Sequence, residues 1–206
     1  MRKMFIICFA LCFLAGNIVC TKSVTSNESA QSDASQADAA TANQTVTYII
    51  PKGEHYPTPN PLVFTTASKV TFYAVFDSSC IYKTVDPQNQ NDINKLYGFS
   101  DCNTQHLVNS ARVGWRWSND SLRIFAFVHN NSVMLYKEIT TARIGRKINC
   151  SISCLADQYG FTVNNKTVQL PRHCTGNYTR YKLFPYFGGD EVAPHKIKIK
   201  ITELSN

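Results

Sequence analysis

Hydrophobic and polar residues alternate along much of the chain, and this alternation predicts β-strands. In the segment 197–201 isoleucine and lysine alternate strictly, so that the isoleucines share one face and the lysines share the other. β-branched residues with a period of two are typical of a strand that is dry on one face and wet on the other. Similar patterns predict strands over 45–50, 69–76, 111–117, 122–128, 133–139, 147–154, 159–163 and 167–170.

Short polar turns rich in asparagine separate the later strands. They occur at 118–121, at Asn130-Asn131 and at Asn164-Asn165. Asparagine tolerates the left-handed backbone conformation that tight hairpins require. No stretch of the sequence shows a sustained helical period. The sequence therefore predicts an all-β fold, a jelly-roll-like antiparallel β-sandwich over residues 46–206.

The start of the chain has the pattern of a secretory signal peptide. Two basic residues, Arg2 and Lys3, precede an apolar run over 4–14, and small residues follow it. This run is shorter than the ~20 apolar residues that a membrane helix needs, and no other apolar run is long enough. We therefore predict that residues 1–20 are a signal peptide and that the protein is secreted. Lipid anchoring at Cys20 is the alternative localisation.

The next segment, 21–45, is rich in Ser, Ala, Thr and Gln and has almost no large apolar side chains. Such a composition buries too little surface to offset the entropy lost on ordering, so we predict a disordered stalk. What remains of the chain has the usual size of one domain.

The formal net charge of +7 permits a nucleic-acid partner. A simpler role exists for several of the positive charges, because Lys196, Lys198 and Lys200 lie on one face of a predicted strand. Lysines on an exposed strand discourage edge-to-edge pairing. We therefore expect no nucleic-acid partner.

The predicted domain contains several Asn-X-Ser/Thr sequences, which are acceptors for N-glycosylation in a eukaryotic secretory pathway. Several fall at predicted turns, where exposure is expected. In a bacterial protein the same residues would act only as turn formers. The predicted acceptors are Asn119, Asn130, Asn149, Asn165 and Asn177.

Five cysteines, at positions 80, 102, 150, 154 and 174, fall in the predicted domain. Cysteines of secreted proteins tend to pair. We predict one disulfide between Cys154 and Cys174, a second between Cys80 and Cys102, and a free buried thiol at Cys150. A zinc site formed by cysteines 150, 154 and 174 with His173 is the alternative, but its spacing matches no known zinc finger. We therefore predict no metal and no cofactor.

Three segments carry polar and aromatic residues that hairpins do not require: 94–102, 106–117 and 181–195. Sugar sites combine aromatic faces, which cover the apolar side of a ring, with carboxylates and fork-shaped donors that bind hydroxyl groups. These segments supply that combination. The candidate ligand-binding residues are Tyr97, Asp101, His106, Arg112, Trp115, Tyr186, Asp190, Glu191 and His195.

Each candidate also has a structural interpretation. Trp115 shares a strand face with Val113, which favours a core position, and Arg112 can pair with an acid on the outer sheet. Asp190 and Glu191 resemble a general acid and base beside His195. Adjacent carboxylates in a strand point to opposite faces, however, so they form no working pair unless the loop bends. No nucleophile elbow, zinc-protease motif or phosphate loop is present, so catalytic residues stay unassigned.

Two sequence segments carry a resemblance to a known group of proteins. With F-P-Y-F-G-G-D-E-V-A-P-H-K-I-K-I at 184–199 and S-A-R-V-G-W-R-W at 110–117, the chain resembles secreted concanavalin A-like jelly-roll proteins. This group includes lectins, glucanases and polysaccharide-lyase-like domains, so the resemblance implies a jelly roll with a carbohydrate partner. The acids that glucanases space along one strand are absent here.

The function expected from these observations is binding of glycans or other extracellular partners, without assigned catalysis. The alternative is a polysaccharide hydrolase or lyase whose catalytic groups lie near Asp190, Glu191 and His195, with Arg112 or His106 as further candidates. A purely structural surface protein is the third interpretation. Because folds of this kind host many activities, the choice depends on which side chains meet in space.

Overall fold

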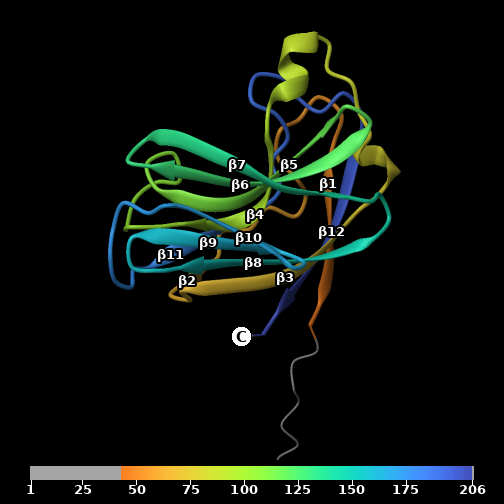
Figure 1. The fold of residues 1–206 in the computed structure, drawn as a ribbon. Coiled ribbons are helices and arrows are strands. Elements are labelled where there is room, and N and C mark those ends of the chain that lie inside the picture. The colour runs from red at the N-terminus through yellow and green to blue at the C-terminus, as the bar shows by residue number, and fades with distance from the viewer. Residues whose placement is uncertain (1–42, 206) are drawn as a thin grey trace, which may run out of the picture. The chain divides into compact units, whose positions relative to one another are not determined.

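The computed structural model describes residues 43–205, which form two antiparallel sheets of six strands each that pack face to face (Figure 1). The first sheet has the order β1 (Thr45–Ile50), β12 (Ile197–Leu204), β3 (Lys69–Phe76), β8 (Lys147–Cys154), β9 (Gln158–Val163), β10 (Lys166–Pro171). The second has the order β2 (Phe64–Thr65), β11 (Arg180–Leu183), β4 (Asn94–Ser100), β5 (Ser110–Ser118), β6 (Ser121–Asn130), β7 (Val133–Ala142). The predicted fold, an antiparallel jelly-roll β-sandwich, is confirmed.

The core lies between the two sheets and follows the predicted alternation. In β3 the residues Val70, Phe72, Ala74 and Phe76 are buried while their neighbours reach the outer face. The isoleucines of β12 and alternate residues of β8 and β9 complete this side of the core. On the other side, β5 and β6 contribute most of the buried surface.

The hairpin turns lie at the asparagine-containing segments where they were predicted, except that one turn is shifted by one residue. Asn119 and Asp120 have φ values of 51° and 52°, the left-handed pair that a two-residue hairpin turn requires. Between β6 and β7 the left-handed residues are Asn131 and Ser132, so Asn130 belongs to β6. Four of the five predicted acceptor asparagines are exposed and Asn130 is half-buried, so their glycosylation stays a prediction.

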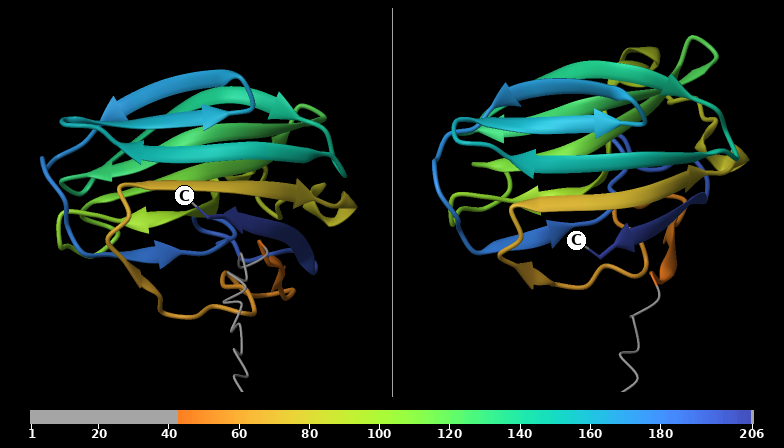
Figure 2. Two further views of the ribbon diagram at one scale, coloured as in Figure 1. Left: turned by 90° about the horizontal axis from the view of Figure 1, so that it is seen from below. Right: turned by 60° about the horizontal axis from the view of Figure 1, so that its bottom comes forward.

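Figure 2 shows β12 within its sheet, and its register corrects the expectation for the lysine face. The strand pairs with β1 on one side and β3 on the other, so it is an interior strand and β1 is the edge. Lys198 and Lys200 are exposed on its outer face. These lysines keep one face of the sheet wet but do not protect an edge.

Strand β4 was not predicted as a strand, and it corrects the expectation for segment 94–102. Six of its seven residues are buried, so it shows no alternation of polar and apolar positions. Two of the predicted ligand residues lie in or beside it: Tyr97 is in the core, where its hydroxyl donates to Glu203 at 2.6 Å, and Asp101 has no exposed surface. Neither side chain is accessible to a ligand.

Asp101 is the centre of a buried ionic cluster. Its Oδ1 accepts a hydrogen bond from Nε of Arg180 at 2.8 Å, and its Oδ2 accepts one from Nε of Arg172 at 2.7 Å. The hydroxyl of Tyr159 also donates to Oδ2, at 2.9 Å. Burial alone would raise the pKa of Asp101, but the hydrogen bond from Arg172, with further hydrogen bonds and the Arg180 charge, holds this pKa below its usual value. The carboxyl group is therefore ionised.

The disulfide connectivity differs from the predicted one. Cys102 pairs with Cys174, and Cys80, Cys150 and Cys154 are free. The prediction paired neighbours along the chain, Cys154 with Cys174 and Cys80 with Cys102, whereas the fold brings the end of β4 to the loop after β10. Cys80 lies instead under β12, with its sulfur 3.6 Å from the carbonyl oxygen of Lys198. The prediction that Cys150 is a free buried thiol is confirmed.

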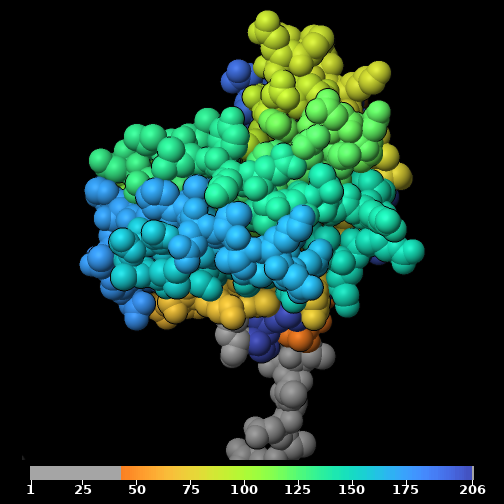
Figure 3. Space-filling view, viewed as in Figure 1, coloured from red at the N-terminus to blue at the C-terminus, as the bar shows by residue number. Residues whose placement is uncertain are grey.

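Two short 3-10 helices, η1 (Ser78–Cys80) and η2 (Pro87–Asn91), interrupt the strands. The segment that carries η2, yellow-green in Figure 3, projects from one edge of the sandwich. None of the helices in the described part of the chain is long and apolar enough to span a membrane. The predicted signal peptide and the predicted stalk up to residue 42 lie outside the described residues.

We expect Asp101→Asn to lower the free energy of unfolding by about 3–5 kcal/mol, the usual cost of breaking a buried ion pair. Urea denaturation measures this loss. The control is Glu138→Gln, which breaks the half-exposed Arg123–Glu138 pair at 3.0 Å and should cost less than about 1 kcal/mol. Because the folded pKa of Asp101 is lowered, its contribution is present above the unfolded pKa of about 3.9 and is lost as pH falls below it. Equal losses in the two variants would contradict this account.

Peptide mapping without reduction should yield one linked pair of peptides, containing Cys102 and Cys174. An alkylating reagent should modify Cys154 first among the free cysteines, because Cys80 and Cys150 are fully buried. The linked residues are 72 positions apart, and closing a loop of that length stabilises a fold by about 4 kcal/mol in the chain-entropy model. A linked peptide containing Cys154 or Cys80 would contradict this connectivity.

Candidate functional site

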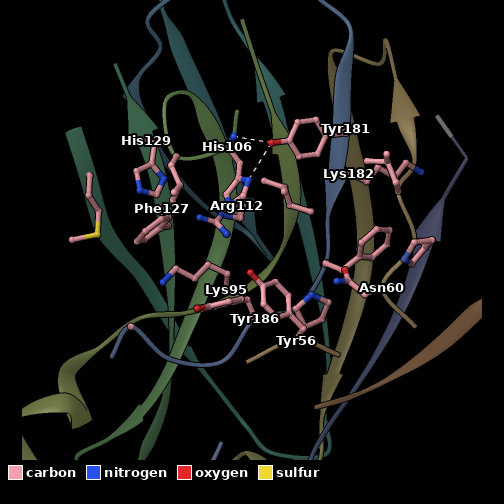
Figure 4. A pocket seen from close by; sticks show the side chains of 18 residues that line it. Tyr56, Asn60, Lys95, His106, Arg112, Phe127, His129, Tyr181, Lys182 and Tyr186 are labelled. Atoms are coloured by element: carbon pink, nitrogen blue, oxygen red, sulfur yellow. Dashed lines mark hydrogen bonds between the residues drawn. The ribbon is translucent and has the colours of Figure 1, made fainter. Parts of the chain in front are cut away.

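A cleft of about 460 Å³ lies on the outer face of the second sheet (Figure 4). Strands β4, β5, β6, β7 and β11 form its floor, and the segments around residues 56–62 and 184–189 form its walls. Its lining contains basic and aromatic side chains but no aspartate or glutamate. The charged and aromatic lining residues are Tyr56, Lys95, His106, Arg112, Phe127, His129, Tyr181, Lys182, Phe184 and Tyr186.

Arg112 is the central cation of the cleft. Its neighbours in β5, Ala111 and Val113, face the core, so the alternation of the strand directs Arg112 outward. Strand β4 lies unusually close to β5 at this point, because a Cβ atom on Gly98 would collide with the backbone of residues Ala111 and Arg112. Arg112 is only 5% exposed.

The guanidinium group of Arg112 makes no hydrogen bond or ion pair with any described residue, and its Nε is buried without a partner. The guanidinium lies over the ring of Phe127, whose centroid is 5.3 Å from Cζ. Burial lowers the pKa of Arg112 to about 10, so the group is still charged at neutral pH. A buried cation without a counter-ion is costly, and this one faces the cleft.

Lys95 supplies a second cation. An antiparallel bridge between Lys95 and Tyr186 places its side chain beside the cleft wall. The Nζ atom lies 4.9 Å from the ring centroid of Phe127 and 5.6 Å from that of Tyr186, and it donates a hydrogen bond to the carbonyl oxygen of Gly188 at 3.1 Å. Burial, and then the charge of Arg112, lower the pKa of Lys95 to about 8.

Two histidines in the cleft are neutral at neutral pH. Burial lowers the pKa of His129 to about 4, with further contributions from the charges of Arg112, Lys95 and His106. Burial also lowers the pKa of His106, and the charge of Arg112 adds to this effect. His106 is held by Tyr181, whose hydroxyl lies 3.0 Å from the ring Nδ1 and accepts the backbone N–H at 2.8 Å.

Aromatic rings form one wall. Tyr56 meets Tyr186 edge to face with centroids 5.1 Å apart, and His55 stacks on the same tyrosine at 5.1 Å. Tyr56 is 58% exposed, so its ring is available to a ligand. Lys182 also lines the cleft, but its Nζ bonds both carboxylate oxygens of Glu203 at 2.7 Å. It is therefore a paired cation.

The structure brings together three of the predicted ligand residues: His106, Arg112 and Tyr186. Trp115 has no exposed surface and packs in the core between Phe76 and Tyr82. Its burial corrects the suggestion that it covers a sugar ring.

The remaining predicted residues lie outside the cleft and hold loops. Glu191 accepts hydrogen bonds from the backbone of Val85 and Asp86 and from Nδ2 of Asn89, so it anchors the segment that carries η2. These hydrogen bonds lower the pKa of Glu191. Nε2 of His195 lies 2.8 Å from the carbonyl oxygen of Ser79. Asp190 is exposed on the loop. Asp101 and Asp190 do not line the cleft that contains Arg112.

Sequence reasoning missed two important cleft residues, His129 and Lys95. A signal for the first was present, because His129 continues the outward face of Phe127 one residue beyond the predicted strand 122–128, and β6 extends to Asn130. Lys95 had no such signal, since β4 itself was not recognised.

The two sandwiched antiparallel sheets form a jelly-roll β-sandwich, and solved structures share this fold. Alginate lyase AlyC3 superposes with a TM-score of 0.52 at 10% identity, over 79% of this chain and 74% of that chain. A functionally unknown protein from Saccharomyces cerevisiae matches with a TM-score of 0.50 at 10% identity, over 79% of this chain and 88% of that chain. At this identity the likeness concerns the fold alone. No family model matches the sequence, and no curated protein matches it either.

Proposed function

We propose that the protein binds an acidic saccharide in the cleft and that Arg112 binds its anionic group. One observation carries this proposal: Arg112 is a buried guanidinium without a counter-ion, in a cleft whose described lining has no carboxylate. An anionic ligand supplies the missing counter-charge. A guanidinium fork binds a carboxylate through two parallel hydrogen bonds, which also fixes the orientation of the ligand.

The rest of the lining suits a sugar better than a small inorganic anion. The exposed ring of Tyr56 and the neighbouring Tyr186 offer aromatic faces for the apolar side of a pyranose. The cleft volume of about 460 Å³ lies within the range of small-molecule sites. The shared fold with alginate lyase AlyC3 supports the same class of ligand, an acidic polysaccharide.

We expect Arg112→Gln to weaken binding of an acidic oligosaccharide by about 1.5–3 kcal/mol, the range for hydrogen bonds to charged groups. This corresponds to a roughly ten- to hundredfold higher Kd. Titration calorimetry with uronate oligomers measures the change, and neutral glucan oligomers serve as the comparison ligands.

The matched control is Arg123→Gln, which removes a positive charge paired with Glu138 elsewhere on the same sheet. Its Kd should stay close to that of the wild type. Equal weakening in both variants would point to a general charge effect. Equal affinity of the wild type for neutral and acidic oligomers would contradict the proposal.

A second candidate function is β-elimination of an acidic polysaccharide, and a specific observation favours it. His129 is a neutral imidazole in the same cleft as Arg112 and the phenol of Tyr186. In a lyase, a base removes the proton next to the carboxylate, the C–O bond to the leaving sugar breaks, and an acid protonates the leaving oxygen. His129 suits the role of the base, Tyr186 that of the acid, and Arg112 stabilises the negative charge that develops on the carboxylate.

Hydrolysis suits this cleft less well. Most glycoside hydrolases use two carboxyl groups on opposite sides of the scissile bond, whereas the lining residues in the described part of the chain include none. The expected hydrolase or lyase groups Asp190, Glu191 and His195 lie in a loop outside the cleft. A lyase in the cleft is therefore the catalytic function that fits the residues present.

If the protein is a lyase, His129→Gln should lower kcat by about a hundredfold or more, the usual contribution of a general base. Ultraviolet absorbance of the unsaturated sugar product reports the turnover. His195→Ala should keep wild-type turnover, because His195 lies outside the cleft. Loss of turnover in His195→Ala with retention in His129→Gln would reverse this assignment. If the wild type binds the oligomers without turnover, the lyase function is rejected and only the binding function stands.

A further inference from the structure

The amine of Lys95 has an unusual environment among the lysines of the cleft. Its Nζ lies near the rings of Phe127 and Tyr186 and donates a hydrogen bond to a neutral group, the carbonyl oxygen of Gly188. Lys182, which also lines the cleft, is bonded instead to the carboxylate of Glu203. Lys95 therefore has a partly buried amine that forms no ion pair with a described residue. The charge of Asp92 raises the pKa of Lys95, but burial and the charge of Arg112 outweigh it.

The position of the Gly188 carbonyl is fixed by the turn that contains it. Gly188 has a φ of +86°, and a Cβ atom there would collide with the carbonyl oxygen of Glu191. Its N–H donates to the side-chain oxygen of Asn94, the residue before Lys95. This turn fixes the carbonyl oxygen that accepts one hydrogen bond from the Lys95 amine. The other positions on the nitrogen remain for other groups.

The guanidinium of Arg112 and the amine of Lys95 both approach the ring of Phe127, whose centroid lies 5.3 Å from Cζ of Arg112 and 4.9 Å from Nζ of Lys95. The charge of Arg112 acts on the amine and lowers its pKa. A lysine that is desolvated, or that lies next to another cation, is the usual form of a nucleophilic amine in proteins. Both conditions hold for Lys95, and its pKa of about 8 agrees with them.

We propose that Lys95 is a nucleophilic lysine that forms an imine with a carbonyl compound whose anionic group is held by Arg112. The ligand class is an aldehyde or ketone with a nearby carboxylate, such as a 2-oxo acid or the open-chain form of an acidic sugar. The inference shares Arg112 with the proposed saccharide site but adds a covalent reaction that binding alone does not require.

The reaction needs no oxidant or reductant. The lone pair of Nζ adds to the carbonyl carbon, and the carbonyl π electrons move to the oxygen, which takes a proton and becomes a hydroxyl. The nitrogen gives up its two protons over the reaction, one when the hydroxyl forms and one when that hydroxyl leaves as water, and a C=N bond replaces the C=O bond. The neutral imidazole of His129 or the phenol of Tyr186 can carry these protons within the cleft.

Reductive trapping tests the proposal. The folded protein is incubated with glyoxylate and sodium cyanoborohydride, which converts an imine into a stable carboxymethyl amine, and the modified lysines are located by peptide mass spectrometry. Near neutral pH, Lys95 should be labelled about ten- to hundredfold faster than Lys182 or Lys198, because ordinary lysines titrate near pH 10.4. Labelling of Lys95 should rise with pH and level off above about pH 8, as the neutral amine becomes the main form.

Two comparison compounds test the role of the anionic group on the wild-type protein, so the result does not depend on whether a variant folds. Glycolate has the same carboxylate but no carbonyl group, so an excess should slow labelling of Lys95 and leave Lys198 unaffected. Acetaldehyde has the carbonyl group but no carboxylate, so it should label Lys95 with less preference over Lys182. In the variant Lys95→Arg the count of fast-reacting sites should fall by one, whereas Lys182→Arg should keep it.

Uniform labelling of Lys95, Lys182 and Lys198 at neutral pH would overturn the proposal. Equal rates with glyoxylate and acetaldehyde, together with no protection by glycolate, would overturn the assigned role of Arg112. The wild-type protein of the same preparation is also titrated with uronate oligomers. Binding of these oligomers without fast labelling of Lys95 would reject the imine chemistry and leave the proposed saccharide site intact.

Discussion

The ionised carboxylate of Asp101 is the interaction on which the arrangement of the two sheets depends. Asp101 directly follows β4 of the second sheet and bonds Arg180 of β11 in the same sheet. Tyr159 of β9 reaches it from the first sheet, and Arg172, which follows β10, reaches it from the same side. Removing a carboxylate from water costs several kcal/mol unless good hydrogen bonds replace the water. Here both oxygens are satisfied. The adjacent Cys102–Cys174 disulfide joins the same two parts of the chain.

A buried charge needs a partner of opposite charge, and the cluster at Asp101 and the cleft at Arg112 differ in whether a described residue supplies that partner. Around Asp101, one buried anion meets two guanidinium groups, so both carboxylate oxygens are paired with cations. The buried guanidinium of Arg112 forms no ion pair with a described residue. Strand β4 connects the two regions, because Asp101 follows its last residue and Lys95 lies at its other end.

The sequence predicted those elements whose residues alternate, and it failed where burial is complete. Strands β1, β3 and β8 match their predicted bounds because one face is wet. Strand β4 is buried on both faces, so no pattern marked it. The disulfide, and the burial of Asp101 against arginines more than seventy residues away, arise from contacts between distant segments. Local sequence carries no signal for such contacts, whereas the outward direction of Arg112 was readable from its neighbours.

An anionic ligand at Arg112 should act on the protonation of Lys95 and His129 in two opposite ways, which connects the proposed functions. Its charge removes part of the repulsion that lowers the pKa values of both groups. The same ligand displaces water and so strengthens desolvation, which is the larger cause of both shifts. Because the free amine and the free imidazole are the reactive forms, the reactivity of both groups in the complex depends on the balance between the bound charge and the displaced water. The cleft therefore couples anion binding to the protonation of the nitrogens around it.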